Sequence, residues 1–423
     1  MDSTSVERLA NTDVAVQAPP AKAHTLRALI IASLADGESL IRGPLLAGDQ
    51  LNVIRCLRGL GVEVTEEPGA LRVAGRGGRY SPAAAELNVG ESGVGMNFLS
   101  SAACLSDRPV VLTGAKRITE RPVGEVVGGL RQLGCQVEFL DREGFPPVRL
   151  AGGGIRGGTC RMRGSVTSQY FSSIVISAPC AEEDVLLRCT DAMSERPYFD
   201  ISVRMMSDFG IDVERDGYRE ARIRAGRSYR PCSLRIEGDY SSASFFFLAA
   251  AICGSRVTVG NLREDTAQGD RGFLEVLAEM GCSVERAGDG VRVEGTRLRA
   301  LERDMGDMPD LVPPAAIAAA FAAGDSRFTN IGQLRVKECD RLAVMVSELA
   351  KMGVSAECDD DSLLVRGGGQ ARGATIDPHN DHRIAMSFAV AGLVTGDQTI
   401  LEPGCVAKSF PDFWERFGAF AAK

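Results

Sequence analysis

The stretch RVKECDRL, residues 335–342, gathers charged side chains at a spacing that could do chemistry. On a helix, Lys337 and Arg341 at i,i+4 share one face, and Glu338 and Arg341 at i,i+3 are neighbours. Two cations beside a carboxylate could hold an anionic substrate while the carboxylic acid moves a proton. The plainer alternative is a solvated helix face, because charged side chains are mostly exposed.

Other segments carry cations or neutral donors where helices are expected to begin, and helix N-termini already favour anions. Each one alone is explained by solvation, by capping or by a structural salt bridge. The whole set, spread along the chain, predicts a cleft that recognises a polyanion. Its members are Lys22 and Arg27 after a pair of prolines, Arg121 in TERPVGEVV, the run Thr167, Ser168 and Gln169, Arg383 in NDHRIAM, and Lys408 in CVAKSFPDF.

The bulk composition sets bounds on the class of protein. A chain of 423 residues exceeds what one hydrophobic core usually organises, which predicts two domains. A net charge of −8 argues against a protein that binds nucleic acid through bulk electrostatics. The twelve cysteines have no metal-like spacing, and with three histidines we expect reduced, apolar thiols and no metal site.

Neither a targeting segment nor a membrane span is expected. The first residues, MDSTSVERLANTDVAVQ, lack a basic region followed by an apolar one, so no signal peptide is predicted. The longest weakly polar run, residues 311–324, contains two prolines and is too short to cross a bilayer. We therefore expect a cytoplasmic protein without a membrane partner.

A helix end followed by glycine and a strand-like alternation recurs six times, as in LRGLGVEV and LAEMGCSV. The glycine suits a helix C-cap, where the chain enters the left-handed region. Five copies continue through a turn to a second strand, which predicts six α/β repeats, three per domain. We expect one domain at 21–236 and a discontinuous one at 1–20 plus 237–423. The glycines, 65 to 76 residues apart, are Gly61, Gly134, Gly210, Gly281, Gly353 and Gly418.

The chain resembles the 5-enolpyruvylshikimate-3-phosphate synthases of the enolpyruvyl transferase superfamily over nearly its whole length. The resemblance implies an inside-out α/β barrel in each of two domains, built from six βαβαββ repeats, with the active site in the cleft between the domains. It rests on RVKECDRL, NDHRIAM, CVAKSFPDF, LTGAKRITERPVGEVVGGLRQLG, TSQYFSSIVISAP, RPYFDISVRMMSDFG and EGDYSSASFFFLAAA.

The resemblance implies transfer of the enolpyruvyl group of phosphoenolpyruvate to the 5-hydroxyl of shikimate 3-phosphate, with release of phosphate. The reaction would pass through a tetrahedral intermediate and would serve the shikimate pathway of aromatic amino-acid biosynthesis. No metal, organic cofactor or nucleic acid is implied, and the protein is expected to be a monomer. Family members are targets of the phosphoenolpyruvate analogue glyphosate.

Roles follow by resemblance for individual positions. Asp310 would accept the proton of the attacking hydroxyl, and Glu338 with Lys22 would protonate the methylene carbon. Arg27 would pair with the shikimate carboxylate, and Gly93 would let the backbone approach phosphoenolpyruvate. The cations expected on phosphoenolpyruvate are Lys22, Arg121, Arg341, Arg383 and Lys408. The remaining expected substrate contacts are Ala23, Thr167, Ser168, Gln169, Tyr198, Gln333 and Lys337.

Several positions depart from the family pattern. Ala23 stands where serine is usual, which removes one hydrogen bond, and Gln333 replaces a common asparagine. In GESGVGMNFL, Asn97 replaces a residue that is usually arginine or similar. Val94 and Phe98 change the helix that follows Gly93, which predicts a tighter pocket and weaker glyphosate binding.

The segment SERPY departs most. Glu195 stands where a phosphate-binding serine is often found, three residues before Tyr198. A carboxylate there would repel a phosphate, so we expect Ser194 to take its place through a shift of one residue. Without that shift, the acceptor could differ from shikimate 3-phosphate.

Three alternatives stay open. The sister transferase for UDP-N-acetylglucosamine normally carries a reactive cysteine near the position of Arg117, and TGAKRITERP has none. An enolpyruvyl transferase with another hydroxyl acceptor is suggested by Ala23, Asn97 and Glu195. A binding protein that only kept the fold would predict decay of the acid–base set, yet that set is intact.

Overall fold

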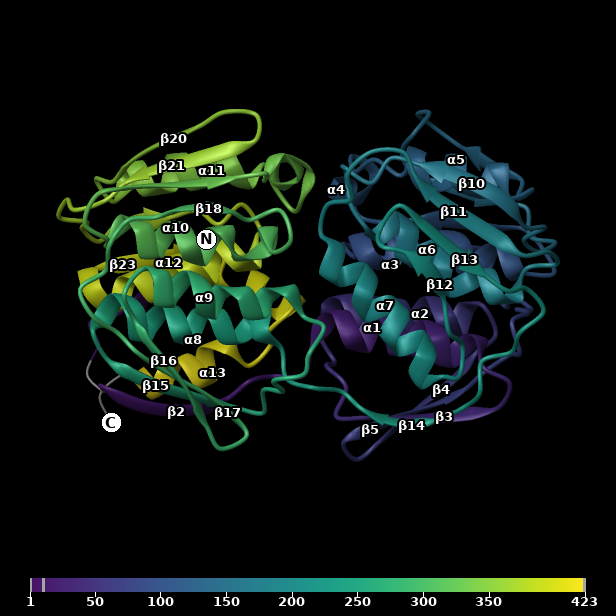
Figure 1. Ribbon diagram of the computed structural model, residues 1–423, viewed down its shortest axis with the longest axis horizontal. Helices are drawn as coiled ribbons and strands as arrows, with labels where there is room; N and C mark the ends of the chain where they lie inside the picture. The colour runs from purple at the N-terminus through teal and green to yellow at the C-terminus, as the bar shows by residue number, and fades with distance from the viewer. Residues whose placement is uncertain (1, 10–11, 421–423) are drawn as a thin grey trace. The chain divides into compact units, whose positions relative to one another are not determined.

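The computed structural model describes residues 2–9 and 12–420, and the chain divides into two compact units (Figure 1). Unit 1 comprises Met1–Pro19 and Glu237–Lys423, and unit 2 comprises Pro20–Ile236. Each unit has its own hydrophobic core. The two are described separately below.

Unit 2 contains three four-stranded sheets of identical strand order. In each sheet the first two strands are parallel and the other two pairs are antiparallel. The sheets are β14 (Ser233–Arg235), β3 (Glu38–Arg42), β5 (Ala70–Ala74) and β4 (Glu63–Glu67); β6 (Glu86–Asn88), β7 (Val110–Thr113), β9 (Val148–Leu150) and β8 (Val137–Phe139); and β10 (Gly158–Met162), β11 (Val185–Cys189), β13 (Glu220–Ile223) and β12 (Glu214–Asp216).

Two kinds of helix accompany these sheets. One helix per sheet is buried on nearly all sides, and these three helices pack against one another. The others are amphipathic and precede the antiparallel strand pairs. The buried helices are α1 (Lys22–Leu34), α3 (Gly93–Ala102) and α6 (Gln169–Ser177); the others are α2 (Gly48–Gly59), α5 (Gly124–Gln132) and α7 (Arg196–Asp208), with a short α4 (Lys116–Thr119).

Unit 1 repeats this plan with two four-stranded sheets and one three-stranded sheet. The N-terminal strands complete two of them, since β2 joins β15 in parallel and β1 joins β23 antiparallel. The sheets are β2 (Asp13–Gln17), β15 (Arg256–Gly260), β17 (Gly290–Glu294) and β16 (Ser283–Ala287); β18 (Glu302–Asp304), β19 (Asp325–Thr329), β21 (Ser362–Arg366) and β20 (Ser355–Cys358); and β1 (Ser3–Val6), β23 (Gln398–Leu401) and β22 (Thr375–Ile376).

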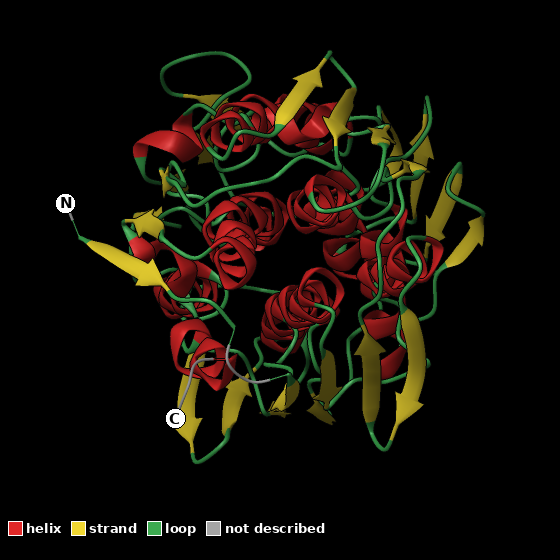
Figure 2. Cartoon of the chain, turned by 90° about the vertical axis from the view of Figure 1, so that its left-hand side faces the viewer, coloured by secondary structure: helices red, strands yellow, loops and turns green. Residues whose placement is uncertain are grey.

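Figure 2 shows helices toward the centre and strands outside them. Unit 1 follows this arrangement around a group of packed helices. The central helices α8, α10 and α12 contact one another. None of the helices in the described ranges has both the length and the apolar character needed to span a bilayer. The helices are α8 (Tyr240–Cys253), α9 (Phe273–Glu279), α10 (Val312–Ala320), α11 (Arg341–Lys351), α12 (His382–Thr395) and α13 (Phe413–Phe417).

The six small mixed sheets are consistent with the predicted repeats. Five of the six predicted cap glycines have the left-handed backbone that the prediction required, with φ between 79° and 115°. Gly418 is the exception and corrects the prediction, because its φ is −57° and the chain continues into a 3-10 turn, Gly418–Phe420, instead of a strand. A left-handed cap reverses the chain, and no described strand follows Gly418 that would need such a reversal.

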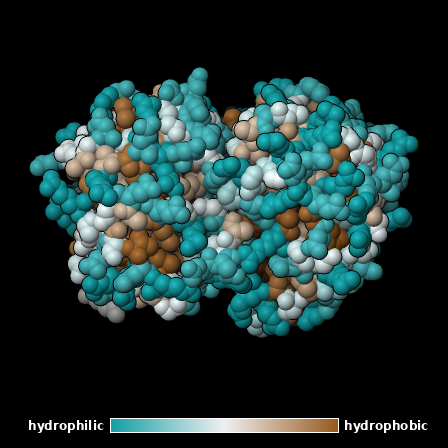
Figure 3. Space-filling view, in the orientation of Figure 1, coloured by the Kyte–Doolittle hydropathy of each residue, from teal (hydrophilic) through white to brown (hydrophobic). Residues whose placement is uncertain are grey.

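The surface visible in Figure 3 is mostly hydrophilic, with apolar side chains in small patches. Among the described residues, four large apolar side chains are exposed, and they are scattered along the chain: Leu46, Leu51, Leu140 and Val336. The apolar side chains that stabilise each unit therefore lie mainly in its buried core.

A glycine after the last strand of a repeat lies directly on the end of a buried helix. At Gly295, after β17, a Cβ atom would overlap the carbonyl oxygen of Ala250 in α8, and at Gly75 and Gly367 it would overlap helix-end carbonyls in the same way. The obstacle is backbone, which cannot move aside cheaply. Close packing of strand on helix thus requires glycine at these three positions.

We expect Gly295→Ala to lower the free energy of unfolding by roughly 1–3 kcal/mol, because the added methyl forces α8 and β17 apart. Gly128→Ala is the matched control, since nothing lies within 4 Å of a Cβ there and the position is inside α5. The control should be neutral or slightly stabilising. Denaturant unfolding of both variants checks this, and equal stability of Gly295→Ala and the native chain would contradict it.

Candidate active site

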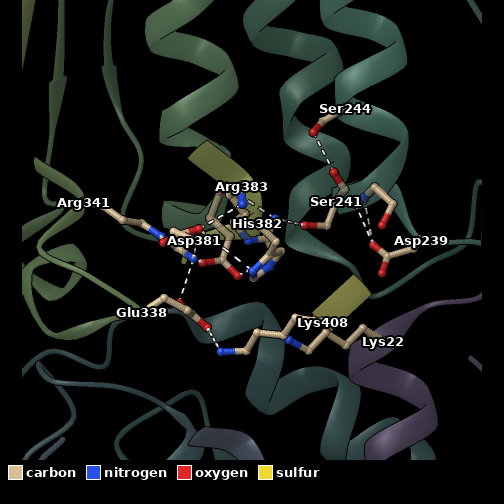
Figure 4. A network of polar contacts seen from close by, with 12 residues as sticks. Lys22, Asp239, Ser241, Ser244, Glu338, Arg341, Asp381, His382, Arg383 and Lys408 are labelled. Atoms are coloured by element: carbon tan, nitrogen blue, oxygen red, sulfur yellow. Dashed lines mark hydrogen bonds and ion pairs between the residues drawn. The ribbon is translucent and has the colours of Figure 1, made fainter. Parts of the chain in front are cut away.

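Arg341 is the centre of a buried charge cluster in unit 1 (Figure 4). Its side chain is 1% exposed, and it is paired with three carboxylates. Nε lies 2.6 Å from Asp381 Oδ2, Nη1 lies 2.7 Å from Asp310 Oδ1, and Nη2 lies 2.8 Å from Glu338 Oε2. Burial alone would lower the pKa of Arg341, but the three carboxylates outweigh it and raise that pKa, so the guanidinium stays charged.

The caps of two helices bring these groups together. Asp340 caps α11 by accepting from the amide of Ala343 at 3.1 Å, so the helix begins at Arg341. Asp381 caps α12 and accepts from the amide of Arg383 at 2.9 Å. The same Asp381 carboxylate pairs with Arg341, which ties the N-terminus of α12 to that of α11.

The prediction that Lys337 and Arg341 share one helix face is wrong. Residues Gly332–Val336 form a 3-10 turn, Lys337 is extended, and α11 begins only after Asp340. A capping aspartate ends the helix pattern ahead of Arg341, because its side chain replaces the missing backbone acceptor. Lys337 is buried nonetheless, and its positive charge acts on Asp310.

Asp310, the predicted base, lies in the 3-10 turn Pro309–Leu311 between two arginines. Arg341 Nη1 contacts its Oδ1 at 2.7 Å, and Arg383 Nη2 contacts its Oδ2 at 2.9 Å. Burial opposes the charged form, yet the charges of Arg383, Lys337 and Arg341 outweigh it and hold the pKa of Asp310 well below its usual range. Among these cations Asp310 is therefore a weak base.

Glu338, the predicted acid, bridges two cations. Its Oε2 pairs with Arg341, and its Oε1 lies 2.9 Å from Lys408 Nζ (Figure 4). Lys408 ends the 3-10 turn Pro403–Lys408 and, like Glu338, has a side chain 11% exposed. Two cations on one carboxylate favour its ionised form.

Arg383 connects this cluster to the N-terminus of α8. Its Nη1 donates to the hydroxyl of Ser241, whose amide in turn donates to Asp239, the N-cap of α8, at 2.8 Å (Figure 4). Ser241 also hydrogen-bonds to Asp270, a buried carboxyl. Burial raises the pKa of Asp270 to about 7, helped by the charges of Asp310 and Asp239 and partly offset by Arg383.

Gln333 lies apart from the charged pairs, and its side-chain amide donates to the carbonyl of Asn330 at 3.4 Å. It is half-buried at the start of the same 3-10 turn that leads to Lys337. Its substrate role stays a prediction.

In unit 2, Lys22 is the first residue of α1 and lies 2.7 Å from the buried carboxylate of Asp49. Gly93 is the first residue of α3, and the Arg121 guanidinium covers it so closely that a Cβ atom would overlap Arg121 Nη1. Arg121 lies between α4 and α5, three residues before the first residue of α5. Lys22 and Arg121 both stay in the region of a helix N-terminus, which favours anions.

Arg27 is almost fully buried in unit 2. It donates to Ser202 Oγ and to the carbonyl of Tyr198, each at 2.7 Å, and to the carbonyl of Ala23 at 3.0 Å. Its guanidinium carbon lies 5.1 Å from the centre of the Phe98 ring. Burial lowers the pKa of Arg27 to about 10, partly offset by Tyr198 and Glu195. Its predicted contact with a substrate carboxylate remains a prediction.

The predicted run of neutral donors surrounds the N-terminus of α6. Ser168 is the N-cap, and Gln169 is the first helical residue. Asn97 donates to the Gln169 side chain at 3.0 Å. The hydroxyl of Thr167 donates to Glu195 Oε2 at 2.5 Å, and that of Ser168 donates to the Glu195 carbonyl at 2.8 Å.

The predicted shift of Ser194 is wrong. The Ser194 hydroxyl donates to the carbonyl of Gly164 at 3.2 Å, and its amide donates to the same carbonyl at 3.0 Å. These two bonds tie Ser194 to Gly164. The carboxylate beside Thr167 is that of Glu195, whose backbone carbonyl accepts from Ser168.

Sequence reasoning missed the carboxylates that pair with the cations. Asp381 is part of NDHRIAM, and Asp239 and Ser241 are part of EGDYSS, so their capping signals were visible in the sequence. Asp49, in the first turn of α2, carried no comparable signal toward Lys22, because the contact depends on how α1 and α2 pack.

A sequence model of the EPSP synthase (3-phosphoshikimate 1-carboxyvinyltransferase) family matches residues 6–417. The chain belongs to the EPSP synthase family. It is 45% identical over 413 residues to the 3-phosphoshikimate 1-carboxyvinyltransferase of Methanoculleus marisnigri, covering 97% of each chain. It is 37% identical over 420 residues to that of Escherichia coli O1:K1, covering 98% of each.

A solved EPSP synthase from Acinetobacter baumannii has the same fold, with a TM-score of 0.83 at 28% identity, over 99% of this chain and 98% of that one. The match extends across both units. The cluster around Arg341 therefore lies on a chain with the fold of an EPSP synthase.

Asp270 should make stability depend on pH. Its pKa is raised to about 7 in the folded protein, against about 4 for an unfolded aspartate, so the folded state holds a proton that the unfolded state releases in between. Its stabilising contribution is complete below about pH 4 and is lost as the pH rises through about 7.

Asp270→Asn removes this dependence, so it should raise the melting temperature relative to the native chain more at pH 8 than at pH 5. Asp360→Asn, at an exposed position, is the control and should show no such difference. Thermal unfolding at both pH values provides the measurement. The same change in melting temperature at both pH values would show that Asp270 is ionised throughout.

Proposed function

We propose that this chain transfers the enolpyruvyl group of phosphoenolpyruvate to the 5-hydroxyl of shikimate 3-phosphate and releases phosphate, as a 3-phosphoshikimate 1-carboxyvinyltransferase of the shikimate pathway. Full-length membership of the EPSP synthase family supports this. The observation that carries it is the cluster in which Asp310 and Glu338 share Arg341, because it joins an acid, a base and anion-binding cations in one place.

Phosphoenolpyruvate is proposed to take cations from both units. Lys22 and Arg121 belong to unit 2, whereas Arg341, Arg383 and Lys408 belong to unit 1. We propose that the units correspond to the domains of 21–236 and 1–20 plus 237–423, each an inside-out α/β barrel of three βαβαββ repeats, with substrates in the cleft between them. The strand order shared by the five four-stranded sheets supports the repeat part of this proposal.

The cluster suggests how the substrate switches on the acid and the base. Asp310 and Glu338 engage Arg341, Arg383 and Lys408 of unit 1. The carboxylate and phosphate of phosphoenolpyruvate would compete for those cations. Because the cations are what lower the pKa of Asp310, sharing them with substrate would make Asp310 a stronger base. The same competition at Glu338 would favour its protonated form.

The proposed reaction proceeds in two stages. Asp310 accepts the proton of the 5-hydroxyl while the oxygen attacks C2 of phosphoenolpyruvate, and Glu338, with Lys22, gives a proton to the methylene carbon. The resulting tetrahedral intermediate then loses a proton from its methyl group and expels phosphate, which restores the double bond in the product. Lys22, Arg121, Arg341, Arg383 and Lys408 would stabilise the negative charge throughout.

The acceptor is proposed to bind mainly to unit 2. Arg27 would face its carboxylate, and the N-terminus of α6 would face its phosphate. This proposal also includes substrate contacts at Ala23, Gln333 and Gly93. Weaker glyphosate binding stays a prediction. The remaining proposed acceptor contacts are Thr167, Ser168, Gln169, Tyr198 and Lys337.

One observation favours a second candidate function. The carboxylate of Glu195 lies 2.5 Å from the Thr167 hydroxyl, in the region proposed for the acceptor phosphate. An enolpyruvyl transferase whose acceptor carries a hydroxyl there, in place of a phosphate, would avoid the repulsion.

The test is the release of phosphate from phosphoenolpyruvate with shikimate 3-phosphate, with shikimate and with no acceptor. We expect release with shikimate 3-phosphate and none without an acceptor, since the acceptor hydroxyl is the attacking group. Asp310→Asn is the negative control for chemistry and should lower kcat by at least about 100-fold, because it removes the base.

Glu302→Gln, at an exposed position in β18, is the matched control for substitution and should keep native activity. Release with shikimate but not with shikimate 3-phosphate would favour the second candidate. No release with either acceptor, from a folded protein, would contradict both.

A further inference from the structure

The carboxylate of Glu195 lies at the N-termini of two helices, where an anion is expected to bind. Its side chain is 1% exposed, and it is the N-cap of α7, hydrogen-bonded to the N-cap of α6. Both helix N-termini favour negative charge. Ser168, the N-cap of α6, donates to the Glu195 carbonyl, and Thr167 donates to its carboxylate. The position that would suit a phosphate thus already holds an anion.

The backbone fixes this arrangement. Glu195 has φ 54° and ψ 36°, in the left-handed region, where a residue with a side chain is uncommon. Two hydrogen bonds from Ser194 to the Gly164 carbonyl hold the residue before it, and Pro197 follows in the first turn of α7. The carboxylate is directed at Thr167 by this turn, so the placement does not depend on a flexible surface side chain.

The direction of the hydrogen bonds decides what the site can offer. A hydroxyl has one proton, and those of Thr167 and Ser168 are both given to Glu195. Thr167 Oγ1 also accepts from the amide of Gln169 at 3.3 Å. In this state the two hydroxyls present acceptor lone pairs, which suit a hydroxyl donor on a ligand and repel a phosphate.

We propose that Glu195 determines acceptor selectivity by competing with the acceptor's phosphate for the N-termini of α6 and α7. This inference rests on the proposed function, since it takes Thr167 and Ser168 as part of the acceptor site. An acceptor with a free hydroxyl can donate to Glu195 and keep the network intact. An acceptor with a phosphate must displace the carboxylate or share the site with its charge. Glu195 therefore weakens the preference for a phosphorylated acceptor.

The test compares Glu195→Gln and Glu195→Ser with the native chain. Gln keeps the size and removes the charge, and it serves as the second variant if Ser disturbs the turn before α7. Glu182→Gln, at an exposed position of the same unit, is the matched control. Steady-state kinetics give KM and kcat for shikimate 3-phosphate and for shikimate, and calorimetric titration gives the Kd of shikimate 3-phosphate without turnover.

Both Glu195 variants should lower KM and Kd for shikimate 3-phosphate at least about tenfold, because a nearby like charge is removed from a buried site. KM for shikimate should stay the same or rise, and kcat should change little, since Glu195 contacts no reacting atom. A purely structural role would instead change both acceptors equally. Unchanged or weaker binding of shikimate 3-phosphate by both variants would overturn the inference.

The experiments distinguish failure of the proposed function from failure of the inference about Glu195. If the native chain and every variant leave phosphoenolpyruvate intact with both acceptors, the proposed function is contradicted. The titration still decides the inference, because tighter binding of shikimate 3-phosphate to Glu195→Gln supports it and equal binding overturns it.

Discussion

The buried guanidinium of Arg341 is the interaction on which the candidate site depends. A charge taken out of water is costly unless it is paired and hydrogen-bonded, and Arg341 has a carboxylate at each of its nitrogens. One of them, Asp381, also caps α12, and the proposed base and acid are the other two. Helix packing and acid–base placement are therefore fixed by a single side chain.

The carboxylates Asp310, Glu338 and Asp381 pair with Arg341, Arg383 and Lys408, and the charge of Lys337 also acts on Asp310. Together these cations make Asp310 a poor base. On the proposed function, an anionic substrate would draw the cations away from the carboxylates. On this account, binding energy from phosphoenolpyruvate is used to change the protonation of groups already in place. Because these charged side chains are already positioned, they need to move little during the reaction.

Local signals in the sequence predicted much of the fold. Five of the six cap glycines were predicted correctly, because a left-handed backbone selects for glycine. Pairing of charges was not predictable, because it depends on which elements meet. Asp49 on Lys22 and Asp381 on Arg341 join residues far apart in the chain. The prediction that Lys337 lies on the same helix as Arg341 failed for a local reason. Asp340 caps α11, so the helix begins after Lys337.

The most direct measurement is acceptor-dependent phosphate release by Arg341→Lys, alongside its thermal unfolding. Lysine keeps the charge but offers one compact ammonium group, which cannot bond three carboxylates in the geometry of a guanidinium. The account predicts a folded protein whose kcat falls by at least about 100-fold, comparable to the loss of one preorganised electrostatic contact. Arg366→Lys, at the exposed end of β21, should leave kcat unchanged. Activity of Arg341→Lys within about threefold of the native chain would contradict the central role given to Arg341.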